Sequence, residues 1–254
     1  MDTNKPPSIS PNPWTDLQQF TPARIALGRA GNSLPTRAHL DFQLAHALAR
    51  DSVHIPVDFS VLEQHLSDQG YPCLRLQSLA ENQAMYLQRP DLGRLLATTP
   101  PPSASMDVVI VVADGLSSQA IAHHAAAFLN LLLPALQQQA YVLAPVCLVK
   151  HARVAIGDAV AAHFNAKLCV VLVGERPGLS SPDSMGIYFT YQAQAGISTD
   201  ADRNCISNIH HNGLSYQQAL RKLLFLIAEA EKLGYSGCLL KDETQVGDEM
   251  LTVG

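Results

Sequence analysis

Continuous apolar runs in the second half of the chain predict the strands of a buried sheet. Residues 107–113, 141–149 and 168–173 are rich in valine, leucine and isoleucine and show no polar alternation. Such runs are typical of strands that are covered on both faces. Apolar helical patterns over residues 119–137 and 153–164 separate them. Strands and helices that alternate in this order predict right-handed crossovers and a parallel sheet.

The end of the chain extends this pattern. Residues 186–192 form an aromatic-rich run that predicts a fourth strand, and residues 216–233 predict a long final helix that ends at Gly234. We therefore predict the α/β fold class, with an open, mostly parallel, Rossmann-like sheet that carries helices on both faces. A mainly helical N-terminal region precedes this sheet.

The first half of the chain has shorter patterns. Apolar residues recur at helical spacing within residues 34–51 and 58–69, which predicts amphipathic helices, and residues 72–77 alternate like a short edge strand. Residues 99–105 are rich in proline and predict a stiff linker. The predicted divisions are a flexible tail (1–13), a mainly helical region (14–98), the linker (99–105), an α/β domain (106–241) and a second tail (242–254).

Composition adds that few charges are available to cover the surface. Of the 254 residues, 47% are hydrophobic and only 15% are charged, so we expect a partner to cover part of the surface. The formal net charge of -5, without a stripe of lysine and arginine, argues against nucleic-acid binding. No apolar stretch approaches the length of a membrane span, so we expect no membrane partner and a cytoplasmic location. The five widely spaced cysteines predict reduced thiols, with Cys147 and Cys169 in the core.

Polar loops follow the apolar strands and should meet at one edge of the sheet, where ligands bind in open α/β folds. They are residues 114–118, 150–153 and 174–178. Glu175 and Arg176 lie between glycines, so an acceptor and a forked donor stand where backbone can approach a ligand. Residues 200–213 combine carboxylates, asparagines, a thiol and two histidines. This density is typical of a pocket wall or an interface loop.

Motifs for other chemistries are incomplete. The glycine patterns of dinucleotide and phosphate loops are absent. Residues 115–119 lack the final glycine of the Gly-x-Ser-x-Gly nucleophile motif, which leaves a stand-alone α/β hydrolase or transferase as a weaker alternative. The pairs His123–His124 and His210–His211 are interpreted as structural, because no His-x-x-x-His motif with a carboxylate accompanies them. We therefore predict no metal site.

Several separated segments, in the same order, resemble the small subunit of ethanolamine ammonia-lyase. These segments are residues 24–33, 40–49, 109–117, 171–179 and 201–210, and the similarity spans residues 14–241. The resemblance implies a bacterial lyase that uses adenosylcobalamin to convert ethanolamine to acetaldehyde and ammonia by a radical mechanism. It also implies a hetero-oligomer in which a (β/α)₈ large subunit holds the substrate, residues 14–98 pack on that subunit, and this chain completes the cobalamin site. The chain alone should then be inactive.

The resemblance places the family's cobalamin contacts on Val154, Glu175 and Cys205. Glu175 would accept hydrogen bonds from the amide groups around the corrin, Val154 would offer an apolar contact, and Cys205 would touch the cofactor without binding cobalt. We add Arg153 and Arg176, because a corrin periphery and a phosphate offer acceptors to guanidinium groups. Surface or interface salt bridges explain these two arginines equally well. The resemblance assigns no catalytic residue to this chain.

The remaining expectations concern the cellular location and whether the chain acts without a partner. Some relatives have a longer amino-terminal segment linked to packaging in a bacterial microcompartment, whereas residues 1–13 here are short and rich in proline. The cytoplasm is therefore the expected location, with a microcompartment as the alternative. A lyase small subunit would need its partner for turnover, a hydrolase or transferase would not, and a binding module would hold a cobalamin without any partner.

Overall fold

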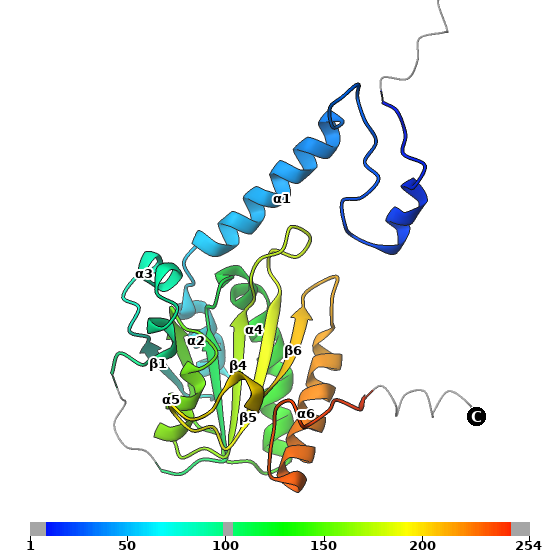
Figure 1. The fold of residues 1–254 in the computed structure, drawn as a ribbon. Helices are drawn as coiled ribbons and strands as arrows, with labels where there is room; N and C mark the ends of the chain where they lie inside the picture. Colours follow the sequence, from blue (N-terminus) through cyan, green and yellow to red (C-terminus); the bar gives the residue numbers. More distant parts are fainter. Residues whose placement is uncertain (1–8, 99–103, 245–254) are drawn as a thin grey trace, which may run out of the picture.

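A six-stranded mixed sheet forms the centre of the molecule (Figure 1). The computed structural model describes residues 9–98 and 104–244. The strand order is β1-β3-β2-β4-β5-β6. The strands are β1 (Cys73–Gln77), β2 (Val108–Ala113), β3 (Val146–Lys150), β4 (Leu168–Gly174), β5 (Met185–Tyr191) and β6 (Arg203–Ile209). The α/β class and the open sheet are confirmed.

Strand direction reverses between β4 and β5. The pairings β1–β3, β3–β2 and β2–β4 are parallel, whereas β4–β5 and β5–β6 are antiparallel. Parallel neighbours need a long crossover, usually a helix, but only residues 175–184 join β4 to β5. The sheet is therefore mostly parallel, as predicted, apart from β5, which runs antiparallel to both of its neighbours.

Helices cover both faces of the sheet. The helices α2 (Phe59–Asp68), α4 (Ser118–Gln138) and α6 (Tyr216–Leu233) pack on one face, in a core with Ile110, Val170 and Phe189. The opposite face, which includes Val111 and Val171, carries the short helix α5 (Ile156–His163). Because α5 has 8 residues and packs on β2 and β4, it leaves the β5–β6 side of its face more open. We call this the α5 face.

Helix α4 corrects one expectation from the sequence. It has 21 residues and is long and apolar enough, by length and composition, to cross a membrane. Half of its most apolar stretch is buried inside the molecule, where Phe128, Leu132 and Leu136 are fully covered. Its apolar composition is therefore explained by its place as the central core helix, which packs on the sheet and contacts both α2 and α6.

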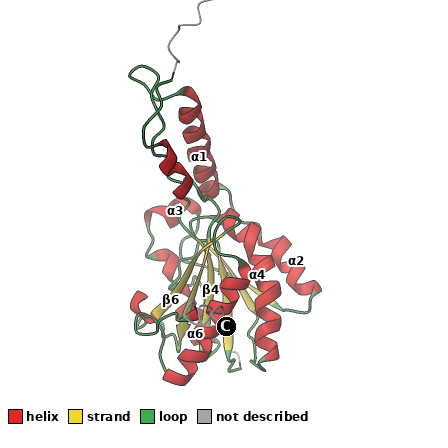
Figure 2. Ribbon diagram, turned by 90° about the vertical axis from the view of Figure 1, so that its right-hand side faces the viewer, coloured by secondary structure: helices red, strands yellow, loops and turns green. Residues whose placement is uncertain are grey.

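The N-terminal part divides between the core and a projecting arm. Strand β1 and helix α2 precede the predicted linker and yet belong to the sheet and its core. Helix α1 (Thr36–His54) extends away from the sheet together with residues 9–35, which include the 3-10 helix η1 (Thr15–Phe20) (Figures 1 and 2). The short α3 (Gln83–Gln88) and η2 (Leu92–Arg94) lie between β1 and the linker. Most of the predicted linker and parts of both predicted tails lie outside the described residues.

Candidate functional site

A buried carboxylate joins the loops that follow β2, β3 and β4. Asp114 is 4% exposed, and its Oδ2 accepts a hydrogen bond from the His151 amide (2.8 Å), while Oδ1 accepts one from the Ala152 amide (3.0 Å). The Leu116 amide donates to the Gly174 carbonyl at 2.9 Å. Burial raises the pKa of Asp114, and its backbone N–H donors act in the opposite direction. The prediction that the three loops meet at one edge is confirmed.

Glu175 is held at this edge by three strands. It directly follows β4, and its Oε2 accepts hydrogen bonds from Ser184 Oγ (2.5 Å) and the Asn208 amide (3.3 Å). A Cβ atom at Gly186, on β5, would come within 2.8 Å of Oε1. No described residue donates a hydrogen bond to Oε1. Glu175 therefore has a fixed orientation and one oxygen available for a ligand.

Cys205 and Val154 lie on the same face of the sheet as Tyr188. Cys205 is exposed on β6 and pairs with Tyr188 of β5. Val154 and Tyr188 are partly buried and pack against the core of the α5 face. Desolvation and the Glu175 carboxylate raise the pKa of the Cys205 thiol, while the Tyr188 hydroxyl lowers it. Cys205 and Tyr188 thus lie on the open part of the α5 face, Glu175 borders it at Gly186, and Val154 packs on the same face just before α5. Sequence reasoning missed Tyr188.

The two predicted arginines have different surroundings. The Arg153 amide donates to the Gly93 carbonyl (2.8 Å), and its guanidinium carbon lies 4.4 Å from the centre of the Tyr86 ring. Its Nε is buried without a hydrogen-bond partner among the described residues. Arg176 is exposed, with no hydrogen bond or ion pair to residues 9–98 and 104–244. Arg153 is therefore a fixed part of the fold, whereas Arg176 is free to meet another molecule.

The polar segment at residues 200–213 includes a strand, and part of the segment lines an open groove, as the predicted pocket wall would. It contains η3 (Asp200–Asp202) and β6, whose outer edge pairs with no described strand. Arg203 donates to both oxygens of Asp158 on α5, at 2.6 and 2.8 Å, and both side chains are buried. Arg203, Ile206 and Ile209 are buried, and the half-buried Asn204 donates hydrogen bonds to the Gly237 and Leu240 carbonyls. The other positions, Cys205, Ser207 and Asn208, are exposed. Because this edge strand has many polar residues, its sequence lacks the apolar run that predicted the other strands.

An open groove of about 550 Å³ follows β6. Its lining includes Cys205 and Asn208 from the strand, with Lys222 of α6 and Asp242 from the C-terminal segment. Cys205 therefore borders both the α5 face and this polar groove. The two predicted core thiols, Cys147 and Cys169, are buried as expected, and burial raises the pKa of Cys147 to about 12.

Sequence similarity to known proteins covers both the arm and the sheet. The family described as ethanolamine ammonia-lyase light chain (EutC) matches residues 11–241. A protein named ethanolamine ammonia-lyase small subunit from Pseudomonas fluorescens (strain Pf0-1) is 51% identical over 251 residues, covering 95% of this chain and 91% of that protein. Proteins of the same name from Ralstonia nicotianae (48%, covering 95% and 92%) and Azotobacter vinelandii (50%, covering 92% and 90%) are similar over comparable lengths.

Proposed function

Because the chain belongs to the ethanolamine ammonia-lyase light chain family, we propose that it is the small subunit of an adenosylcobalamin-dependent lyase that converts ethanolamine to acetaldehyde and ammonia. When bound, adenosylcobalamin supplies the radical that starts the reaction. The role proposed for this chain is to complete the cofactor site at the interface with a large subunit. The observation that supports this role is that Val154 packs on the α5 face, where Cys205 also lies, and that Glu175 borders this face at Gly186.

The chemistry of these residues fits a corrin. The free Oε1 of Glu175 can accept a hydrogen bond from a corrin amide, and the partly buried Val154 and Tyr188 offer apolar contact. Thiolates, not thiols, bind metals well, and the raised pKa of Cys205 keeps it a thiol at neutral pH. This supports a contact role for Cys205 rather than ligation of cobalt. The guanidinium groups of the partly buried Arg153 and the exposed Arg176 are further donors that we propose for the cofactor periphery or the partner.

The projecting arm supports association with a large subunit. Leu40, Leu44 and Leu48 recur every four residues along α1 and are 56%, 61% and 46% exposed. Trp14 and Phe20, at 66% and 78% exposed, add to the apolar surface of the arm. A row of large exposed aliphatic side chains on one helix face is typical of an interaction surface. We propose that the large subunit covers this face.

The surroundings of Ser117, the best candidate nucleophile, argue against the hydrolase alternative. Ser117 is fully buried; its hydroxyl donates to the Pro182 carbonyl (3.0 Å) and accepts a hydrogen bond from the Ala120 amide (3.2 Å). The hydroxyl therefore caps helix α4 and anchors a loop. Asp114 is likewise occupied by backbone amides. Neither side chain is available to a substrate.

Reconstitution tests the proposal directly. Acetaldehyde release from ethanolamine should require adenosylcobalamin, this chain and a candidate large subunit together, and neither protein alone should be active. A silent mixture of folded, associated proteins would overturn the assigned reaction, and turnover by this chain alone would favour the alternative class.

Glu175→Gln tests the cofactor role within the reconstituted complex. Losing the charge of a hydrogen-bonded carboxylate should weaken adenosylcobalamin binding on the order of tenfold, with a smaller effect on kcat at saturating cofactor. Glu81→Gln, at an exposed position before α3, is the matched control and should leave affinity unchanged. An unchanged affinity with a lower kcat in Glu175→Gln would contradict the proposed contact.

A further inference from the structure

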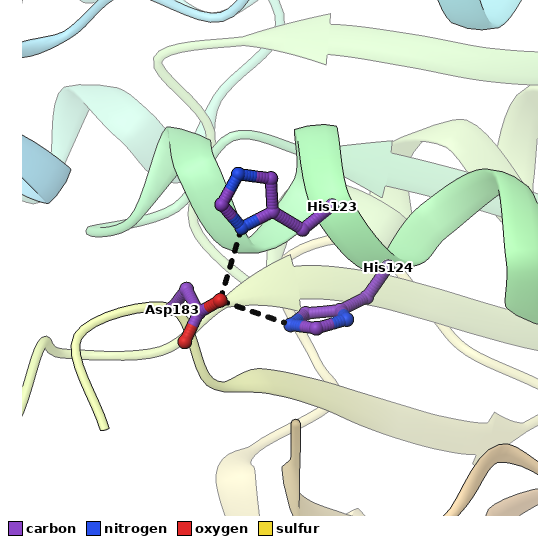
Figure 3. A group of neighbouring side chains, drawn as sticks. All are labelled: His123, His124 and Asp183. Atoms are coloured by element: carbon purple, nitrogen blue, oxygen red, sulfur yellow. Dashed lines mark hydrogen bonds and ion pairs between the residues drawn. The ribbon is translucent and has the colours of Figure 1, made fainter. Parts of the chain in front are cut away.

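Two adjacent histidines and a carboxylate converge near the start of α4 (Figure 3). His123 Nδ1 lies 3.0 Å and His124 Nε2 lies 3.5 Å from the same oxygen of Asp183. One nitrogen from each ring and an oxygen of Asp183 all lie within 4.8 Å of one another. The sequence suggested a structural histidine pair because no carboxylate accompanied it; the fold brings Asp183 to the pair from the loop between β4 and β5.

One nitrogen of the buried ring makes only a long contact. The side chain of His124 is 7% exposed, and its Nε2 lies 3.5 Å from Asp183 without a hydrogen bond of normal geometry to any described residue. Its other nitrogen, Nδ1, is 2.7 Å from the Tyr216 hydroxyl. A buried nitrogen that makes no good hydrogen bond costs free energy, whereas a cation between this nitrogen and Asp183 would satisfy both groups. Tyr216 would then act as the outer partner that fixes the orientation of a ligating ring.

We propose that His123, His124 and Asp183 bind one zinc ion, at a site separate from the proposed cofactor contacts. Two imidazoles and a carboxylate are ligands that Zn²⁺ prefers, and three protein ligands leave one position for water. Ligands at about 2.0–2.2 Å in tetrahedral geometry are separated by roughly 3.3 Å. The observed nitrogen-to-oxygen distances of 3.0 and 3.5 Å bracket that separation. His123 is exposed, so an ion can enter from solvent.

The ion would fasten the loop at residues 175–184 to helix α4. Ser117 already holds this loop through the Pro182 carbonyl, and the next residue, Asp183, would add a metal bond. Ser184, which follows, donates a hydrogen bond to Glu175. Zinc would thus rigidify the segment that orients Glu175. The zinc site itself stands on its own geometry and does not rest on the proposed cofactor role.

Zinc binding by the full chain, purified without a histidine tag and stripped with a chelator, tests the site. We would titrate Zn²⁺ against a chromophoric chelator and record the visible spectrum of the Co²⁺ form. The parent chain should bind one equivalent, with a tetrahedral Co²⁺ spectrum that lacks a thiolate charge-transfer band. His123→Gln and Asp183→Asn should each weaken binding by at least about tenfold, since each removes a ligand.

A matched control comes from the other histidine pair. His211→Gln changes an exposed histidine outside the cluster and should bind Zn²⁺ as the parent does. Circular dichroism should show that all three variants keep the fold, because none removes the buried His124. The proposal is overturned if the parent shows no saturable site, if its Co²⁺ spectrum carries a thiolate band, or if His123→Gln and Asp183→Asn bind as tightly as the control.

Discussion

A single buried ion pair determines how the exposed strand β6 meets the rest of the α5 face. The guanidinium of Arg203 binds both carboxylate oxygens of Asp158, and its NH1 group also lies 3.4 Å from Thr190 Oγ1. The two charged side chains are only 3% and 5% exposed. Asp158 lies on α5, four residues after Val154, and Arg203 lies two residues before Cys205. The pair therefore sets the spacing between two of the proposed cofactor contacts.

Breaking this pair should be costly. Arg203→Met leaves the Asp158 carboxylate buried without a counter-charge, so we expect the free energy of unfolding to fall by about 3–5 kcal/mol in urea denaturation. Arg89→Met, which removes the exposed ion pair with Asp91, should leave the urea midpoint nearly unchanged, because exposed pairs contribute little. A similar fall in the free energy of unfolding in both variants would show that the buried pair stabilises the fold no more than the exposed one.

The sequence pointed to the proposed polar contacts of the site but not to the residues that support them. Glu175 could be found because a charge beside glycines followed a strongly apolar strand, and Cys205 because its segment is unusually polar. Asp158 and Tyr188 carried no such signal. Each acts through a partner more than ten residues away in the chain, and local pattern does not encode that pairing.

At the scale of elements, Asp114 fastens the carboxyl ends of neighbouring strands. It follows β2 and accepts hydrogen bonds from the two residues that follow β3, His151 and Ala152, so a side chain continues the sheet where backbone pairing ends. At the other end of β2, Asp107 performs a similar task with the Val142 amide alone, at 2.7 Å. The two ends of one strand thus use the same chemistry with different numbers of donors.

Replacing the two carboxylates by amides should separate these roles. Asp114→Asn turns one acceptor oxygen into an NH₂ group that faces a backbone N–H, so we expect the free energy of unfolding to fall by about 1–3 kcal/mol. Asp107→Asn keeps an oxygen for its single donor and should cost clearly less. Chemical denaturation of both variants measures the difference, and equal losses would argue against the acceptor count as the cause.

Elements were predictable where their ends carry local signals. Helix α6 begins and ends as predicted, since Ser215 and Gln218 form a capping box and Gly234 adopts a left-handed conformation at φ 81°. Strand β3 begins at Val146, after Pro145, rather than at residue 141. The reversed direction of β5 was missed, because the apolar content of a strand does not state its direction.

At the scale of the whole molecule, the arm and the sheet meet at the proposed cofactor loop. The Arg24 guanidinium donates to the Leu179 carbonyl at 3.2 Å, which joins the arm to the tip of the loop at residues 175–184. Helix α1 buries only Ala45 and Ser52. Most of its surface is thus open to a partner while its base rests on the fold. A subunit bound to the arm would lie close to the cofactor loop.

A negative charge among Leu40, Leu44 and Leu48 of α1 should weaken association with the large subunit and leave this chain folded. For Leu44→Glu we expect association weaker on the order of tenfold, because a carboxylate would be buried at the interface. Its own thermal midpoint should hardly move, since Leu44 is 61% exposed. His46→Glu adds the same charge on the other side of α1 as the control. Sedimentation velocity measures association, and equal binding by both variants would place the interface elsewhere.

The parallel pairing of β1 with β3 has a consequence for synthesis on the ribosome. Residues 73–77 leave the ribosome long before residues 146–150, so β1 cannot take its place in the sheet until its neighbour has been made. During that interval its backbone groups are open to other chains. Arg75 and Gln77 are exposed polar residues within β1, and Arg75 pairs with Glu63 of the nearby α2. These side chains would protect the waiting strand from aggregation.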